Sequence, residues 1–367
     1  MNDVSLMDMK KFFLGANTPL GFVSYFDQIG EYKEGWNRFL IKGGPGTGKS
    51  SLMKSIAIKF KELTDDIELI YCSSDPDSLD GVIFNNKKIS IVDATPPHVL
   101  EPVFPGAFEN TISICDCWDN IVLNKNREEV INLFNENLFY HKQAVNILLS
   151  AYGIIKNNYD IIDRYIDEDN IEDYIKEIID ENFKFLKEGN KWKEQKRFLS
   201  AVSAGEFVFY QDTIKKICDK IYIIDDPYGA VANKILNKIR NKLLNSEIDI
   251  ITCYCSMFGG KKIDHILIPS LKIAFITSNN YHNFTGNCFK VTDHNNFLKY
   301  IPQNLEDQIK FNEDESKKII NQVKVCLKKA KEIHDKLERC YIEAINFKLV
   351  DEKRDNTINM IKTLLNK

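Results

Sequence analysis

Short apolar runs separated by turn-forming residues dominate the first third of the chain. The pattern predicts strands at residues 12–16, 21–25, 39–41, 68–72, 89–93 and 111–115. A helical period follows the third of these runs, over residues 52–58. Strands that alternate with helices are typical of an α/β fold, so we expect a mainly parallel sheet with helices on both faces.

From residue 126 to about residue 189 the apolar positions follow a helical period instead. Val130, Leu133, Phe134 and Leu138 fall on one face of such a helix, and Lys, Glu and Asp occupy the other positions. We predict a helical hairpin appended to the α/β core.

The chain then repeats itself. Residues 13–29 aligned with residues 198–214 are identical at eight of seventeen positions, where chance gives about one. Apolar runs at 221–224, 248–255 and 271–276 follow in the same order, and a second helical segment covers 312–349. We therefore predict a tandem duplication of one α/β core with its helical hairpin, with domains at 1–190 and 191–367.

One stretch between a predicted strand and a predicted helix carries a motif. It reads Gly43-Gly44-Pro45-Gly46-Thr47-Gly48-Lys49-Ser50 and resembles the phosphate-binding loop of P-loop NTPases. Glycines let successive backbone N–H groups point at an anion at a helix N-terminus. The resemblance implies that these eight residues and Ser51 bind nucleotide, that Lys49 reaches the β- and γ-phosphates, and that Ser50 contacts Mg²⁺.

The strand at 89–93 ends in a carboxylate, a pattern that resembles the Walker B strand of the same superfamily. The resemblance implies that Asp93 holds Mg²⁺ together with Ser50. Asp75, Asp77 and Glu101 also follow strands, and ligands of open α/β sheets bind beyond strand carboxyl ends. These three are candidates for a catalytic base, although Asp75 and Asp77 fit an Asx turn equally well.

Further motifs lie between and after these strands. They read CSSDPDSLDG (72–81), VDATPPH (92–98) and PGAFE (105–109). With the duplication, they resemble a group of bacterial ATPase-like proteins that have two tandem P-loop domains. The resemblance covers the full chain and implies an ATP- or GTP-binding α/β fold without indicating a substrate. His98 recurs as His282 in the second repeat, which favours a structural role.

The second repeat lacks the motif. Its matching stretch reads Asp225-Asp226-Pro227-Tyr228-Gly229-Ala230-Val231-Ala232. This alignment places Val231 at Lys49 and Ala232 at Ser50, and Thr277 replaces Asp93. We expect no ordinary Mg-nucleotide site there. From the symmetry of a duplicated pair we expect the second repeat to cover the first site and to donate a positive side chain such as Lys234 or Arg197 towards the γ-phosphate.

Composition bears on the compartment and the binding partners of the protein. A net charge of −4 gives no general attraction to nucleic acid. No apolar run reaches membrane length, and nine cysteines without a framework spacing fit a reducing cytoplasm. We expect a cytoplasmic protein that binds nucleotide and offers its helical hairpins to a protein partner.

Three functions fit these features. The first is an ATP-binding protein that acts as a Mg-dependent ATPase or an ATP-driven switch, although Ala94 follows Asp93 where many ATPases carry a glutamate. The second is a small-molecule or nucleotide kinase, against which the scarcity of arginine argues, because kinase lids use arginines. The third is a non-catalytic scaffold gated by nucleotide. The absence of an Asn-Lys-x-Asp sequence favours ATP over GTP.

Overall fold

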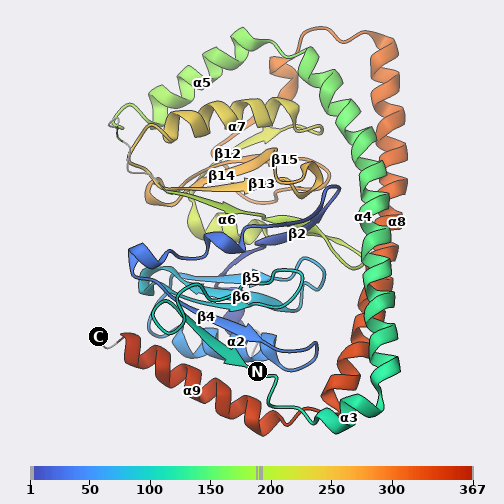
Figure 1. Ribbon diagram of the computed structural model, residues 1–367. Helices are drawn as coiled ribbons and strands as arrows, with labels where there is room; N and C mark the ends of the chain where they lie inside the picture. The colour runs from blue at the N-terminus through green and yellow to red at the C-terminus, as the bar shows by residue number, and fades with distance from the viewer. Residues whose placement is uncertain (1–3, 187–188, 190–192, 366–367) are drawn as a thin grey trace.

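Two six-stranded sheets form the core of the computed structural model, which describes residues 4–186, 189 and 193–365 (Figure 1). The first sheet contains, in spatial order, β1 (Lys10–Phe12), β5 (Ile67–Tyr71), β6 (Leu79–Phe84), β7 (Ile89–Asp93), β4 (Asn37–Lys42) and β8 (Glu109–Ser113). The second contains β9 (Glu194–Arg197), β13 (Ile250–Tyr254), β14 (Ile263–Ile268), β15 (Ile273–Ser278), β12 (Lys220–Asp225) and β16 (Lys290–Asp293). The two strand orders correspond one to one.

Each sheet is mixed, because its third strand runs against both neighbours. β6 is antiparallel to β5 and β7, and β14 is antiparallel to β13 and β15, while the other pairs are parallel. The predicted runs at 39–41, 68–72, 89–93 and 111–115 are strands, and the run at 12–16 is divided between β1 and β2 (Gly15–Thr18). β6 and β14 were not predicted. All six residues of β6 are buried, but they include an aspartate and a glycine, which interrupt an apolar pattern.

Helices cover the outer faces of the sheets, and the inner faces meet. α2 (Lys49–Phe60) packs on the first sheet, and α7 (Ala230–Leu243) packs on the second (Figure 1). Leu40 and Val92 of the first sheet share a core with Ile223 and Ile276 of the second. α6 (Gln211–Ile217) lies in this inner layer. The expectation of helices on both faces of each sheet holds for the outer faces, whereas the inner faces are buried mainly against each other, with the short helix α6 between them.

The two halves are related by a pseudo-two-fold axis between Phe13 and Phe198. The backbone N–H of each donates to the carbonyl of the other, both at 2.9 Å. Tyr25 stacks on Phe198 with ring centroids 4.8 Å apart, and Tyr210 stacks on Phe13 at 4.7 Å. These residues are partners in the sequence repeat. The repeat in the sequence thus corresponds to a symmetric pair of sheets, joined by hairpins β2–β3 (Gly21–Ser24) and β10 (Ser200–Val202)–β11 (Phe207–Phe209).

The helical segments that follow each sheet are exchanged between the halves. α4 (Arg127–Arg164) and α8 (Gln303–Ile342) pack against each other, antiparallel, along both sheets (Figure 1). Each is roughly 60 Å long. α5 (Glu168–Asn182) then packs on α7 of the second half, and α9 (Phe347–Leu365) packs on α2 of the first. Neither α4, α8 nor any other helix in the described part of the chain is both long and apolar enough to cross a membrane.

Matching backbone contacts fix the turns after the long helices. Asp167, after α4, donates its N–H to the Phe297 carbonyl of the second half at 2.7 Å. Asn346, after α8, donates to the Cys117 carbonyl of the first half at 2.8 Å, close to α3 (Asn120–Lys125). The predicted domain boundary between residues 190 and 191 lies outside the described residues. In space, each sheet is completed by helices from the other half of the sequence.

Candidate functional site

The glycine-rich loop between β4 and α2, residues 43–48, lies at one end of the strands of the first sheet, and we call this row of strand ends an edge of the sheet. β4, β5 and β7 are parallel, so their carboxyl ends meet at this edge. Antiparallel β6 begins there. Gly48 caps α2 with φ of +86°, a left-handed conformation that favours glycine. The predicted helix over 52–58 is the centre of α2, so the loop leads directly into a helix N-terminus.

Lys49 turns its ammonium group back over this glycine loop. Its Nζ donates to the carbonyls of Gly43 at 3.2 Å and Gly44 at 2.6 Å. It also lies 3.6 Å from Asp93 Oδ2, and both side chains are largely buried. The Thr47 hydroxyl donates to the Gly44 carbonyl at 2.7 Å and tightens the loop. The structure thus brings together Lys49 and Asp93, two residues that the sequence predicted for one nucleotide site.

The two residues predicted to hold Mg²⁺ each keep oxygen lone pairs available. Ser50 Oγ accepts one hydrogen bond, from the Leu79 N–H at 2.9 Å. Asp93 Oδ1 accepts from the Thr95 N–H at 3.0 Å and from its hydroxyl at 2.6 Å, which leaves Oδ2 beside Lys49. Hydroxyl and carboxylate oxygens are ligands that Mg²⁺ accepts. Ser51, in the first turn of α2, is exposed.

The three candidate bases lie at the same edge in different surroundings. Asp75 makes an Asx turn, because its carboxylate accepts from the Asp77 N–H at 3.4 Å, and it also lies 3.4 Å from Lys331 Nζ. The Asp77 side chain is exposed. Glu101 is exposed and pairs with Lys42 at 2.6 Å. Of the three, Asp75 is the one held in place by a contact from the other half of the chain.

That contact belongs to the end of α8, which packs directly on the glycine loop. A Cβ placed on Gly44 would lie 2.4 Å from the Tyr341 ring, and one on Gly46 would lie 2.7 Å from the Glu338 carbonyl. Both glycines therefore serve this close approach as well as the shape of the loop. No pattern in the sequence indicated these contacts, since Tyr341 and Glu338 follow the loop by almost three hundred residues.

Neither Lys234 nor Arg197 lies at the glycine loop, so the expectation that one of them reaches a γ-phosphate is wrong. Lys234 pairs with Glu168 at 2.5 Å and Asp163 at 3.5 Å, both from α4 and α5 over the second sheet. Arg197 is buried against Glu68 at 3.1 Å. Glu68 is near the start of β5, at the opposite edge of the first sheet from the glycine loop.

The corresponding loop of the second half is occupied by its own carboxylate. Asp226 accepts the backbone N–H groups of Tyr228 at 3.0 Å, Gly229 at 2.9 Å and Ala232 at 2.9 Å. Gly229, with φ of +72°, caps α7 as Gly48 caps α2. Our alignment was therefore shifted by one residue.

In the corrected alignment Ala230 and Val231 match Lys49 and Ser50, and the loop is shorter. Asp226 does not repel a bound anion; it is the anion at this helix N-terminus.

A cation accompanies that carboxylate. Lys262 is buried and pairs with Asp264, and a Cβ on Gly229 would lie 2.7 Å from its Nζ. Burial by itself would raise the pKa of Asp264, but Lys262 and His282 lower it to about 2. The second half thus carries both an anion and a cation in its own side chains.

Asp80 and His98 form a buried pair beside Asp93. His98 Nε2 lies 3.8 Å from Asp80 Oδ1, and the ring stacks on Phe26 at 4.6 Å. Burial lowers the pKa of His98, so the imidazole is neutral at pH 7. Burial and the charge of Asp93 raise the pKa of Asp80 well above its usual value. Asp80 was not predicted as a site residue, although it recurs in the second repeat as Asp264.

Comparisons with protein-family models, with curated proteins and with solved structures find no match to this chain.

Proposed function

We propose that the first half binds Mg-ATP at the glycine loop, and that the protein is an ATPase or an ATP-driven switch. Nucleotide binding would change the packing of α8 and α9. The observation that carries the proposal is the position of Lys49. Its buried ammonium faces the loop carbonyls and lies 3.6 Å from Asp93, at the end of the neighbouring strand. A triphosphate at this helix N-terminus would meet N–H groups, one ammonium and a carboxylate suited to Mg²⁺.

The second half supports anion binding by this kind of loop. There, three N–H groups at the start of α7 converge on the carboxylate of Asp226. The first half has glycines, Pro45 and Thr47 in its longer loop, and no carboxylate among them. A phosphate group from a ligand would take the place that Asp226 takes in the second half.

The proposed switch follows from the helix that covers the loop. Tyr341 and Glu338 of α8 contact Gly44 and Gly46, and Lys331 reaches Asp75. A change in the loop on nucleotide binding therefore changes the packing of α8. Since α8 runs along α4 to the second sheet, such a change alters how the halves are held together.

Turnover should be slow under this proposal. Ala94, a buried apolar residue, follows Asp93 where a glutamate base would stand. Asp75 is engaged by Lys331, and Glu101 is engaged by Lys42. Release of Asp75 by movement of Lys331 towards the phosphates would free a carboxylate for an attacking water, which links hydrolysis to the position of α8.

The test is ATP binding and phosphate release by the full chain with Mg²⁺, compared with the Lys49→Ala variant. We expect Lys49→Ala to weaken ATP binding by at least about tenfold, because an ammonium–phosphate contact is worth about 1.5–3 kcal/mol, and to abolish phosphate release. Lys59→Ala is the matched control, because Lys59 is an exposed lysine on the same helix.

ATP binding that is equal in both variants would overturn the proposed site. Binding without phosphate release would leave the nucleotide site in place and exclude an ATPase. A kinase or a nucleotide-gated scaffold would then account for the site.

A further inference from the structure

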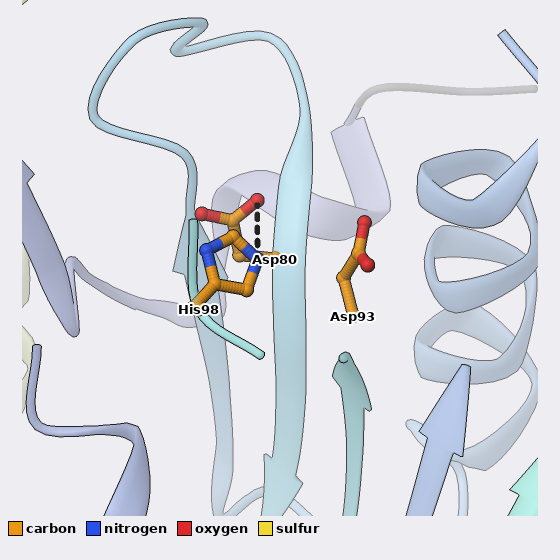
Figure 2. A group of neighbouring side chains, drawn as sticks. All are labelled: Asp80, Asp93 and His98. Carbon is orange, nitrogen blue, oxygen red and sulfur yellow. Dashed lines mark ion pairs between the residues drawn. The ribbon is translucent and has the colours of Figure 1, made fainter. Parts of the chain in front are cut away.

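Three potential metal ligands converge behind the glycine loop. Asp80 lies at the start of β6, Asp93 at the end of β7, and His98 in the turn that follows. One ligand atom from each lies within 4.8 Å of the other two, and each residue is less than a tenth exposed. Figure 2 shows the imidazole of His98 beside the Asp80 carboxylate, with the Asp93 carboxylate across from them. β6, antiparallel between β5 and β7, is what brings Asp80 to this edge.

One member of the group, His98, lacks the hydrogen-bond partners that buried polar side chains ordinarily have. Both ring nitrogens of His98 are buried without a hydrogen-bond partner among the described residues. Two carboxylates, Asp80 and Asp93, have one ammonium close by, that of Lys49 at 3.6 Å from Asp93. Unpaired buried imidazole nitrogens and an excess of buried negative charge both cost free energy. A bound cation would satisfy both.

In the second half the same position receives partners from within the chain for one ring nitrogen and one carboxylate oxygen, while His282 Nδ1 and Asp264 Oδ2 have no hydrogen-bond partner among the described residues. Asp264 and His282 form the same pair, with Nε2 to Oδ2 at 3.6 Å. There the Ser200 hydroxyl lies 2.7 Å from His282 Nε2, and Lys262 contacts Asp264.

The first half differs at each of these points. Gly15 stands in place of Ser200, Ser78 in place of Lys262, and Asp93 in place of Thr277. The match of Ser78 with Lys262 is structural, since their carbonyls accept equivalent hydrogen bonds of 2.9 and 2.8 Å in the two strand turns. The half that lacks the second carboxylate carries a lysine, and the half that lacks the lysine carries the second carboxylate.

We propose that Asp80, Asp93 and His98 bind one divalent transition-metal ion. One imidazole and two carboxylates suit ions such as Mn²⁺, and the imidazole favours them over Mg²⁺, which prefers oxygen ligands. Ligand atoms around such an ion stand about 3 Å apart for bonds of about 2.1 Å, so rotations of the side chains bring the three groups into range. The ion would take the place that the Lys262 ammonium takes in the second half.

Mn²⁺ binding can be measured independently of nucleotide binding, although both proposed sites include Asp93. The probe is Mn²⁺ alone, titrated into the nucleotide-free full chain and followed by calorimetry and by loss of the free-ion electron paramagnetic resonance signal. We expect one Mn²⁺ per chain. Lys49→Ala should retain or strengthen it, because that variant removes a positive charge 3.6 Å from Asp93.

Two variants decide whether these ligands hold the ion. His98→Gln should weaken Mn²⁺ binding at least tenfold, whereas His282→Gln, which alters the matching buried histidine of the second half, should leave it unchanged. Ser78→Lys should abolish binding by placing an ammonium where Lys262 has one. Thermal unfolding verifies that each variant is folded.

Equal Mn²⁺ binding by the wild type and the Ser78→Lys and His98→Gln variants would overturn the proposal, as would no saturable binding by the wild type. Either result would leave ATP binding at Lys49 untouched.

Discussion

The two halves of this protein have the same strand order, but they differ in the charged side chains at the helix N-terminus and around the buried aspartate. In the second half, Asp226 fills the helix N-terminus and Lys262 neutralises Asp264. In the first half, the glycine loop has no carboxylate of its own, and Asp80 and Asp93 share one nearby ammonium. In the second half Lys262 and Ser200 supply partners to the buried Asp264–His282 pair, although Asp264 Oδ2 and His282 Nδ1 have no hydrogen-bond partner among the described residues. In the first half neither ring nitrogen of His98 has such a partner.

If the proposed sites of the first half bind phosphate and a metal ion, the comparison illustrates how a repeat can lose a ligand site without losing its fold. A carboxylate in place of a phosphate, and an ammonium in place of a cation, keep the backbone N–H groups and the buried aspartate paired. The second sheet can then act as a fixed support. The helices α4 and α5 contact the second half through ion pairs such as those of Lys234 with Asp163 and Glu168, and α8 contacts the first half through the pair of Lys331 with Asp75.

The largest expected contrast is between two matched substitutions, Asp264→Asn and Asp80→Asn. Asp264→Asn leaves the Lys262 ammonium buried without its partner, and should lower the free energy of unfolding by about 3–5 kcal/mol. Asp80→Asn removes a carboxyl whose charged form is disfavoured by burial. It should leave the metal-free protein unchanged or stabilise it by about 1 kcal/mol. Denaturant unfolding in the presence of a chelator measures both.

The same pair predicts opposite pH dependences. The pKa of Asp264 is lowered to about 2 in the folded protein, so its contribution to stability is present above its ordinary pKa near 3.8 and disappears as pH falls towards 2. The pKa of Asp80 is raised by burial and by Asp93. The free energy of unfolding that is lost by burying Asp80 is therefore zero in acid, where the carboxyl is protonated in both states, and grows as pH rises above about 4. Equal effects of the two substitutions at pH 7 would contradict this difference between the halves.

Removal of the Asp226 carboxylate should have the next largest effect. Asp226→Ala leaves the N–H groups at the start of α7 without their acceptor, and should cost about 2–4 kcal/mol. Added phosphate or sulfate should restore part of the melting temperature, because a free anion can take the vacated place. Asp225→Ala, at the exposed neighbouring residue, is the control and should change stability by no more than about 0.5 kcal/mol. A lack of anion rescue would argue against Asp226 as a phosphate substitute.

The smallest effect concerns the contact of α8 with the glycine loop. Gly44→Ala places a methyl group against the Tyr341 ring and should cost about 1–2 kcal/mol. Combining it with Tyr341→Ala should recover most of the Gly44→Ala cost, which a double-mutant cycle measures. Gly153→Ala, in α4 with no atom within 4 Å of the added methyl group, should instead stabilise the protein by about 0.5–1 kcal/mol. Additive effects of Gly44→Ala and Tyr341→Ala on the free energy of unfolding would mean that the two residues are not energetically coupled.

Several features could be predicted from the sequence because they depend on neighbouring residues. Apolar runs identified most strands, the helical period identified the long helices, and the glycine stretch was located between β4 and α2. That Lys49 and Asp93 lie close together also agrees with the sequence, which placed both in one site, since parallel strands place their carboxyl ends together. The repeat over 13–29 and 198–214 indicated two related halves before any contact was known.

The tertiary structure decided what depends on residues far apart in the chain. Nothing local in β6 shows that it inserts antiparallel between β5 and β7 and so carries Asp80 towards Asp93 and His98. The exchange of helices depends on the packing of α4 on α8 along both sheets. The role of Asp226 depends on the direction of N–H groups at a helix start. A sequence records which side chains are available, whereas burial and chain path decide which of them meet and which charges remain unpaired.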